Sequence, residues 1–277
     1  MSPVIHPASV EIVVPARNEA RRLPEGLRAL CDKAATLPLR TSILVVDSAS
    51  SDSTADVVRA WPSGPVPVGL LHCERPGKGV AVRAGLLATQ APFVGFCDAD
   101  MATDLSAIDV AISLLAAGHP MVIGSRALGA SVVEARSSSV RKVGAAVFRS
   151  MARWVVPGAS DTQCGFKFFS GPLARVAARP LRTAGFAFDV ELIASCLRLG
   201  ATLTEIPVRW QDMAGSTFSV RRHSAASFRE LTSIWLRSRI PLSGPAPAPV
   251  LVPRPRPMPD RQLLPDRQLT VAGATEK

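Results

Sequence analysis

Two aspartates follow directly on an apolar run in the sequence GFCDADMATD of residues 95–104. Asp98 and Asp100 lie two residues apart, and on an extended backbone such residues point to the same side, where their charges repel. A hard divalent cation fits this arrangement, because it binds one or two carboxylates while a substrate phosphate completes its shell. The alternative is a pair of solvated loop acids that cap a turn, so the surrounding sequence has to decide.

Three further polar segments follow apolar runs, and each has a purely structural explanation when taken singly. Glu19 could be an acid at the start of a helix, residues 50–54 could cap the next helix, and Gly77 and Gly79 could form a turn. Their occurrence together with the aspartate pair favours one shared site. The segments are VPARNEA at 14–20, VVDSASSDST at 45–54 and RPGKGVAVRAG at 75–85.

The elements that must position these residues alternate regularly over the first half of the chain. Short apolar runs separated by stretches of helical periodicity predict a doubly wound α/β fold, with a mostly parallel sheet covered on both faces. Ligands collect at the carboxyl ends of the strands in such sheets, and Asp47 and Asp98 each end a strand. The predicted strands are EIVVP, SILVVD, VGLLH and FVGFC, and the predicted helices cover about 19–33, 52–61 and 78–89.

The second half continues the same domain in a less regular form. We expect the strand MVIGSR from residue 121, a basic helical stretch, a helix near 189–199 and a strand in TLTEIPVRW at 202–210. After residue 240 proline becomes too frequent for a helix or a central strand. We therefore expect an N-terminal extension over 1–10, one domain over 11–240 and a disordered proline-rich tail over 241–277.

The composition limits the partners and the compartment. The net charge of +10 and the pI near 10.4 indicate an anionic partner, which could be nucleic acid, a phosphorylated substrate or acidic lipid. The cysteines include no CxxC pair, which favours a reducing compartment. No apolar stretch reaches the roughly 18 residues that span a bilayer, and the N-terminus lacks the pattern of a secretion signal. We expect a cytoplasmic protein without a membrane span.

The ordered motifs resemble one enzyme family. From about residue 11 to 240 the chain resembles the inverting nucleotide-sugar glycosyltransferases of family 2, in particular the dolichyl-phosphate β-glucosyltransferase and dolichyl-phosphate mannose synthase branch. The resemblance implies the GT-A fold, a Rossmann-like doubly wound sheet, together with a nucleotide-sugar donor and Mg²⁺ or Mn²⁺. It is carried by VPARNEA, VVDSASSDST, PGKGVAVRAG, DADMAT, GSR, DTQCGFKFF, FAFDVEL and EIPVRWQDMAGS, of which DTQCGFKFF and FAFDVEL are most similar to the glucosyl branch.

The resemblance implies a donor site built from the motifs of the first half. Asp98 and Asp100 would hold the metal ion on the donor diphosphate. Asp100 would be catalytic because this ion neutralises the charge that develops on the leaving diphosphate. Lys78 would bring a point charge to the nucleotide from its glycine loop. The remaining donor-binding positions that the resemblance implies are Pro15, Glu19, Asp47, Gly79 and Ala99.

The second half is implied to bind the acceptor and to complete the reaction centre. Arg126 would reach the acceptor phosphate, although taken alone it would be an ordinary surface arginine. Asp189 and Glu191 are either reaction-centre carboxylates or acids in the first turn of a helix. A hydroxyl acceptor would need a general base. A phosphate acceptor is already anionic, with a second pKa of about 6, so with such an acceptor Asp189 could merely orient groups. The floor of the site would include Gln163, Lys167 and Ser216.

Two positions depart from the pattern of this branch. Ser48 follows Asp47 where the branch usually has a second acid, and Thr217 stands where it usually has a lysine. The lost lysine removes a charge that would face a phosphate, which Arg221 or Arg222 could replace.

Residues 142–155 predict an amphipathic helix. A basic face beside an apolar face that contains Trp is typical of a helix lying on anionic lipid, and equally of a surface helix packed on a globular core. The basic face comprises Lys142, Arg149 and Arg153, and the apolar face comprises Val143, Val147, Met151 and Trp154.

Together these observations predict a metal-dependent inverting transferase that moves a hexose, glucose by the resemblance, from a UDP-sugar to a polyprenyl phosphate, with peripheral membrane contact left open. One alternative is a soluble family 2 enzyme that acts on a small-molecule hydroxyl. An alternative of another class is a basic nucleic-acid-binding protein, although the sequence contains no helix-turn-helix, zinc or RNA-stacking motif.

Overall fold

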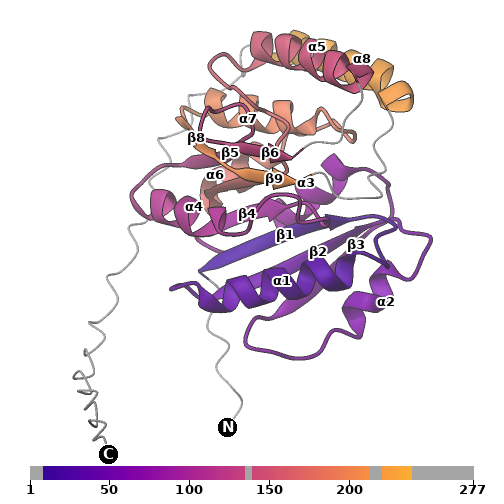
Figure 1. Cartoon of the computed structure of the whole chain (residues 1–277), viewed down its shortest axis with the longest axis vertical. Coiled ribbons are helices and arrows are strands. Elements are labelled where there is room, and N and C mark those ends of the chain that lie inside the picture. The colour runs from indigo at the N-terminus through magenta and orange to yellow at the C-terminus, as the bar shows by residue number, and fades with distance from the viewer. Residues whose placement is uncertain (1–8, 135–138, 212–219, 239–277) are drawn as a thin grey trace, which may run out of the picture.

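The computed structural model describes residues 9–134, 139–211 and 220–238. A sheet of seven strands in the order β3-β2-β1-β4-β7-β5-β8 forms its centre, and Figure 1 shows how the helices surround this sheet. This arrangement confirms the predicted doubly wound, mostly parallel α/β sheet. The strands are β1 (Val10–Ala16), β2 (Thr41–Ser48), β3 (Val68–Cys73), β4 (Phe93–Cys97), β5 (Met121–Ser125), β7 (Phe166–Ser170) and β8 (Leu203–Pro207).

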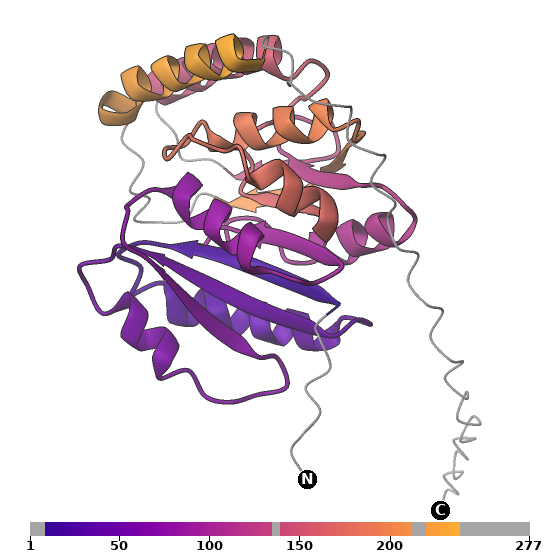
Figure 2. The same ribbon diagram turned by 180° about the vertical axis from the view of Figure 1, so that it is seen from behind.

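Helices cover both faces of the sheet and form a further layer at one end. Helix α1 lies on one face and α3 and α6 on the other, as the two opposite views show (Figures 1 and 2). Helices α5 and α8 lie side by side and pack on α7. The helices are α1 (Leu23–Thr36), α2 (Thr54–Arg59), α3 (Lys78–Ala88), α4 (Ala107–Ala116), α5 (Ser139–Val155), α6 (Gly171–Ala178), α7 (Phe188–Arg198) and α8 (Val220–Ser238).

The core consists of two apolar clusters, one on each face of the sheet. Strand β1 contributes side chains to both, with Ile12 and Val14 in the cluster under α1 and Val13 in the cluster under α3. Strands buried on both faces need apolar residues at successive positions, which explains the unbroken apolar runs of the sequence. The paired strands β1, β2 and β3 are parallel, so their carboxyl ends lie along one edge.

Strand β7 is antiparallel and lies between β4 and β5, where no strand was predicted from the sequence. Because it runs in the opposite direction, its first residue, Phe166, pairs with Cys97 at the carboxyl end of β4. The backbone N–H of Asp98 then donates to the carbonyl of Gly165 at 3.1 Å. The DTQCGFKFF motif is thereby brought beside the aspartate pair.

The predicted boundaries of three elements were wrong. Helix α1 begins at Leu23 rather than at Glu19, because Asn18 has a positive φ of 55° and the N–H of Glu19 donates to Thr54 Oγ1 at 2.8 Å. Helix α2 is shorter than predicted at both ends. The predicted strand at 202–210 divides at Val208 into β8 and β9 (Arg209–Gln211), and β9 pairs with β6 (Val132–Glu134) in a second, two-stranded sheet.

The predicted N-terminal extension and the proline-rich tail lie almost entirely outside the described residues, and so does Ser216 with Thr217. The domain limits of 11 and 240 stay predictions. Within the described part of the chain, no helix is both long enough and apolar enough to cross a membrane.

Candidate active site

Asp98 and Lys78 form the centre of the site at the carboxyl edge of the sheet. Asp98 follows β4, and Lys78 is the first residue of α3. The Lys78 ammonium Nζ lies 2.5 Å from Asp98 Oδ1. A Cβ at Gly165 would lie only 1.9 Å from Asp98 Oδ2, so the glycine leaves the room that the carboxylate occupies. The structure thus places a positive charge beside the predicted aspartate pair.

Asp100 lies close enough to Asp98 for the two charges to interact. Burial raises the pKa of the Asp100 carboxyl, and the charge of Asp98 raises it further. Its Oδ1 accepts a hydrogen bond from the N–H of Ala102 at 3.2 Å. A divalent cation between the two carboxylates would remove this repulsion, so the pair fits the predicted metal.

The remaining ligands of such an ion would be water and a bound substrate. Among the described residues, no three His, Cys, Asp or Glu side chains are grouped so that they could hold a metal. The Asp98 side chain remains 32% exposed, and it lines a small pocket together with Met101, Thr103 and Trp210. Asp98 therefore remains partly open to solvent at this pocket.

Lys78 stays charged because of its acidic neighbours. Burial alone would lower the pKa of its ammonium, but the charges of Asp98, Asp189 and Asp100 raise it above its usual value. The turn before it depends on Gly77, whose φ of 143° is rarely open to other residues. The N–H of Gly77 donates to Ser48 Oγ at 2.8 Å. Ser48, the departure from the family pattern, thus holds the turn that carries Lys78.

The predicted nucleotide-binding residues lie at the ends of β1 and β2. Asp47 is buried, and its Oδ2 lies 2.9 Å from His72 Nδ1. Glu19 receives two hydrogen bonds from the Arg22 guanidinium, at 2.8 and 2.6 Å. Burial nevertheless raises the pKa of the Glu19 carboxyl. Pro15 pairs in register with Val46. His72 was not predicted, because its contact with Asp47 depends on the β2–β3 register.

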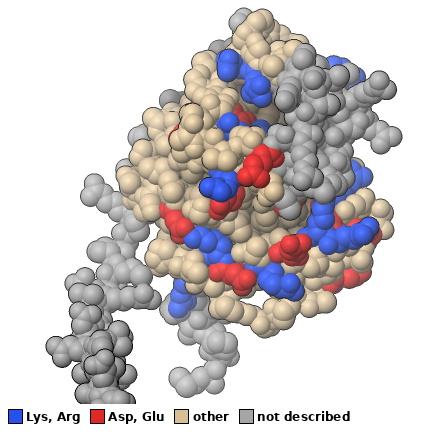
Figure 3. Space-filling model, viewed as in Figure 1, with Lys and Arg blue, Asp and Glu red and all other residues tan. Residues whose placement is uncertain are grey.

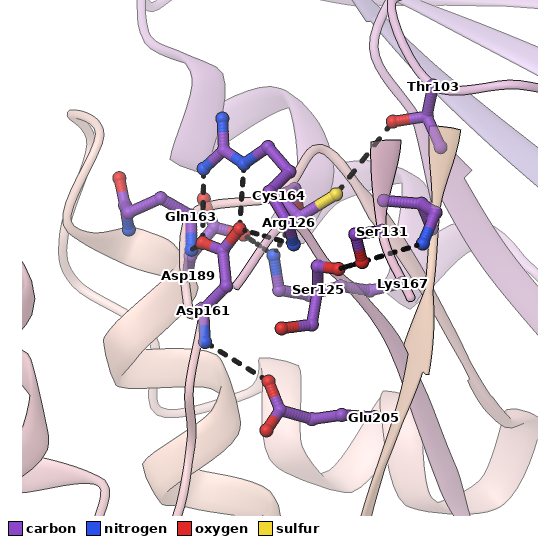
Figure 4. A network of polar contacts seen from close by, with 11 residues as sticks. Thr103, Ser125, Arg126, Ser131, Asp161, Gln163, Cys164, Lys167, Asp189 and Glu205 are labelled. Atoms are coloured by element: carbon purple, nitrogen blue, oxygen red, sulfur yellow. Dashed lines mark hydrogen bonds and ion pairs between the residues drawn. The ribbon is translucent and has the colours of Figure 1, made fainter. Parts of the chain in front are cut away.

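Arg126 is held in a fixed position by Asp161, a residue that was not predicted as part of the site. Its Nε and Nη2 donate to the Asp161 carboxylate at 2.7 and 3.0 Å, and Asp161 also accepts from the Arg126 backbone N–H (Figure 4). The guanidinium lies over the ring of Trp210 at 5.4 Å. Burial alone would raise the pKa of Asp161, but its hydrogen bonds and ion pair with Arg126 lower it to about 2.

Lys167 and Asp189 form a buried ion pair beneath this centre. Lys167 is fully buried on β7, and its Nζ donates to Asp189 Oδ1 and to the carbonyl of Cys164, both at 2.6 Å (Figure 4). Burial raises the pKa of Asp189, while Lys167 and Lys78 oppose that rise. Because Lys167 and Asp189 bind each other, contact of either side chain with a substrate would require this ion pair to separate.

Several buried polar atoms near Arg126 have no hydrogen-bond partner within the described residues. They are Nε2 of Gln163, Oγ of Ser125 and Oγ1 of Thr162. Buried polar atoms are usually satisfied by protein, water or ligand. Gln163 was predicted to contact substrate, and its unsatisfied amide is consistent with that prediction.

The other predicted positions lie at different distances from this centre. Gly79 continues the Lys78 turn, and its N–H donates to the carbonyl of Ala184 at 2.9 Å. Ala99 is buried between the two aspartates of the pair. Glu191 accepts from the N–H groups of Arg182 and Thr183 and from Arg237, so both of its oxygens are engaged.

The charge on the face of the molecule seen in Figure 1 is mixed. Figure 3 shows acidic and basic side chains interspersed over the lower half of this face, where α1 lies. A surface that binds nucleic acid usually presents a continuous basic patch. This face therefore does not favour the nucleic-acid alternative.

Three comparisons with known proteins agree on the kind of molecule. The sequence profile of glycosyl transferase family 2 matches residues 11–170. A dolichyl-phosphate β-glucosyltransferase of Drosophila melanogaster is 34% identical over 244 residues, which cover 82% of this chain and 74% of the relative. The human dolichyl-phosphate β-glucosyltransferase is 32% identical over 223 residues, covering 75% and 68%.

Among solved structures, a glucosyl-3-phosphoglycerate synthase of Mycobacterium tuberculosis is similar in fold. Its complex with Mn²⁺, UDP and glucosyl-3-phosphoglycerate superposes with a TM-score of 0.61 at 20% identity. The match covers 86% of this chain and 82% of that one. At this identity the similarity establishes a shared fold.

Replacing Asp161 by Asn should destabilise the fold by about 2 kcal/mol at pH 7, because Arg126 loses its partner in a buried position. The Asp161 pKa is lowered from 3.8 to about 2, so its contribution is present above about pH 4 and is lost as the pH falls through about 2. Urea unfolding of both proteins at pH 7 and at pH 3 measures the difference. Asp56→Asn, in an exposed pair with Arg59, is the control, and a difference that does not change with pH would contradict the prediction.

Proposed function

Because the chain belongs to glycosyltransferase family 2 and has its GT-A fold, we propose that it transfers glucose from UDP-glucose to a polyprenyl phosphate of the dolichyl type. The contact of Lys78 with the aspartate pair carries this proposal. It brings together, at the end of β4, an ammonium group and two carboxylates that could bind a donor diphosphate and its metal ion. The relatives named as dolichyl-phosphate β-glucosyltransferases support the sugar and the acceptor. The UDP and Mn²⁺ of the mycobacterial synthase support the donor and the ion.

The donor half of the site would stabilise the leaving diphosphate. Asp98 and Asp100 would hold Mg²⁺ or Mn²⁺, which supplies positive charge to neutralise the charge developing on that diphosphate. Lys78 keeps its ammonium protonated because its pKa is raised, and it would contribute a second positive charge. The Ser48 hydroxyl fixes the turn before this lysine.

The acceptor half has features that suit an anionic nucleophile. A phosphate monoester with a second pKa of about 6 needs no base at neutral pH. The two carboxylates predicted near the reaction centre, Asp189 and Glu191, are both engaged by other protein groups, which agrees with an acceptor of this kind. Arg126, oriented by Asp161, would attract the acceptor phosphate.

The reaction would be a single in-line displacement. An oxygen of the acceptor phosphate forms the new bond to the anomeric carbon while the bond from that carbon to the diphosphate oxygen breaks. UDP leaves with the electron pair of the broken bond, and the α-linked donor gives a β-linked glucosyl phosphate. No proton has to be moved when the acceptor enters as the dianion.

The outer layer of the molecule would bring the enzyme to the membrane that carries the lipid. On α5, Trp154 is 74% exposed and Val147 46%, and Arg149 and Arg153 are exposed on the same helix. On the neighbouring α8, Leu236 is 56% exposed. Exposed apolar and basic side chains on an amphipathic helix are what binding to an anionic bilayer surface requires. The side chains of Lys142, Val143, Arg221 and Arg222 lie outside the described residues.

Incubation of the full chain with UDP-glucose, Mg²⁺ and a polyprenyl phosphate should give a β-linked glucosyl phosphate lipid, measured as radiolabel that partitions into organic solvent. UDP-mannose and GDP-mannose in place of UDP-glucose test the donor. Transfer to a small-molecule hydroxyl without any lipid product would instead establish the soluble alternative.

Replacing Asp100 by Asn should lower turnover on the order of a hundredfold, because one of two metal-binding carboxylates loses its charge. A titration of Mn²⁺ should show that the variant loses the metal-dependent part of the rate. Asp109→Asn, a surface change at an ion pair with Lys33, is the matched control and should keep its activity. Unchanged turnover in Asp100→Asn would contradict the assigned role.

Replacing both Arg149 and Arg153 by Gln should weaken binding to vesicles that contain phosphatidylserine by roughly thirtyfold, since each basic residue contributes about 1 kcal/mol near such a surface. Co-flotation at low and high salt measures the binding. Val110→Ala changes an exposed apolar residue on α4 and serves as control. Equal flotation of the double variant and the wild type would argue against a membrane role for this face.

A further inference from the structure

A short loop, residues 182–187, lies between α6 and α7 and is held by carboxylates from two different helices. Glu191 on α7 accepts from the N–H groups of Thr183 at 2.8 Å and Arg182 at 3.1 Å. Glu230 on α8 accepts from the N–H of Ala187 at 3.4 Å. A carboxylate that accepts several backbone N–H groups fixes the course of a loop strongly, because charge-assisted hydrogen bonds are the stronger ones.

The other side of this loop packs closely against the glycine turn that carries Lys78. The carbonyl of Ala184 accepts from the N–H of Gly79 at 2.9 Å. A Cβ at Gly79 would lie 2.2 Å from the carbonyl oxygen of Thr183, and a Cβ at Gly77 would lie 2.5 Å from that of Ala184. No other residue type fits between the turn and the loop, so the position of the loop sets the position of the turn.

The glycine turn determines where the Lys78 ammonium contacts Asp98. Lys78 lies between the two glycines, and its Nζ is 2.5 Å from Asp98 Oδ1 and 5.9 Å from the centre of the Phe188 ring. Phe188 follows the loop directly as the first residue of α7. The loop therefore supports Lys78 through the backbone of the turn, and the Phe188 side chain beside the loop contacts Lys78 as well.

Both carboxylate oxygens of Glu191 are engaged by protein groups. Its Oε2 accepts the two loop N–H groups, and its Oε1 accepts from Arg237 Nη2 at 2.9 Å. Its side chain is only 12% exposed. This geometry serves to position other groups, although the resemblance had placed Glu191 among the candidate reaction-centre carboxylates.

We propose that Glu191 is a positioning residue, which holds the loop 182–187 against the glycine turn and thereby seats Lys78 for the donor diphosphate. The inference rests on the proposed function for its donor. Arg237 extends the linkage to α8, so the helix layer that carries the exposed Leu236 and Trp154 is connected to the donor site through this carboxylate.

Hydrogen exchange of the full chain without any ligand tests the first part of the linkage. Glu191→Ala should speed exchange in the peptide around Gly79, because the amide of Gly79 depends on the carbonyl of Ala184. Glu191→Gln should keep most of the protection, since its amide oxygen can still accept from the loop. Glu25→Gln, an exposed change on α1, is the matched control and should leave this peptide unchanged. Equal exchange in Glu191→Ala and the wild type would overturn the proposal.

Binding of UDP with Mn²⁺, measured by calorimetry, tests the second part. Glu191→Ala should weaken UDP binding roughly tenfold, within the range found for coupled neighbours, and the double variant with Lys78→Ala should bind no more weakly than Lys78→Ala alone. Additive losses, or a loss in turnover at unchanged UDP affinity, would contradict a role that acts through Lys78.

Two further outcomes separate this inference from the function on which it rests. If Glu191→Ala does not fold, Arg237→Ala is used instead, because it removes the contact of Glu191 with α8 and leaves its two hydrogen bonds to the loop. This variant should show a smaller change of the same kind in hydrogen exchange and in UDP binding. If the wild type binds no UDP, the proposed donor is wrong, and the exchange experiment still decides whether Glu191 holds the turn.

Discussion

The repulsion between Asp98 and Asp100 is the constraint on which the rest of the site depends. Two carboxylates at the end of a buried strand repel each other, and burial, together with the charge of Asp98, raises the pKa of Asp100. Lys78 supplies compensating positive charge in the protein alone. Under the proposed function a sugar nucleotide would bring negative charges of its own, and a divalent ion would then be needed to balance them.

Around this centre the charged groups are arranged in pairs whose members come from distant parts of the chain. Arg126 pairs with Asp161, and Lys167 pairs with Asp189. Each pair is largely buried, so that removal of one partner would leave an uncompensated charge in a poorly hydrated place. Such pairs hold the second half of the site rigid, while Asp98 at the pocket remains partly exposed to a ligand.

Much of the first half of the fold was predictable from the sequence, because it depends on local patterns. Strand β4 and the start of α3 lie where their apolar run and glycine turn placed them. Strand β7 was not predicted, since its lysine becomes compatible with burial only through Asp189, 22 residues further on. The partners Asp161 for Arg126 and His72 for Asp47 depend likewise on register and on long-range packing. The catalytic roles given to Asp189 and Glu191 remain predictions, as does the substrate contact of Ser216.

The antiparallel insertion of β7 between β4 and β5 also has a consequence for how the enzyme is made. Residues 166–170 close against residues 93–97 only after more than half of the chain has been synthesised. Until then Asp98 lacks the Gly165 carbonyl that its backbone N–H contacts, and Lys167 and Asp189 have not met. Contacts between distant parts of a chain form late in folding. A nascent chain that stops before β7 therefore lacks the contacts that complete this edge of the sheet.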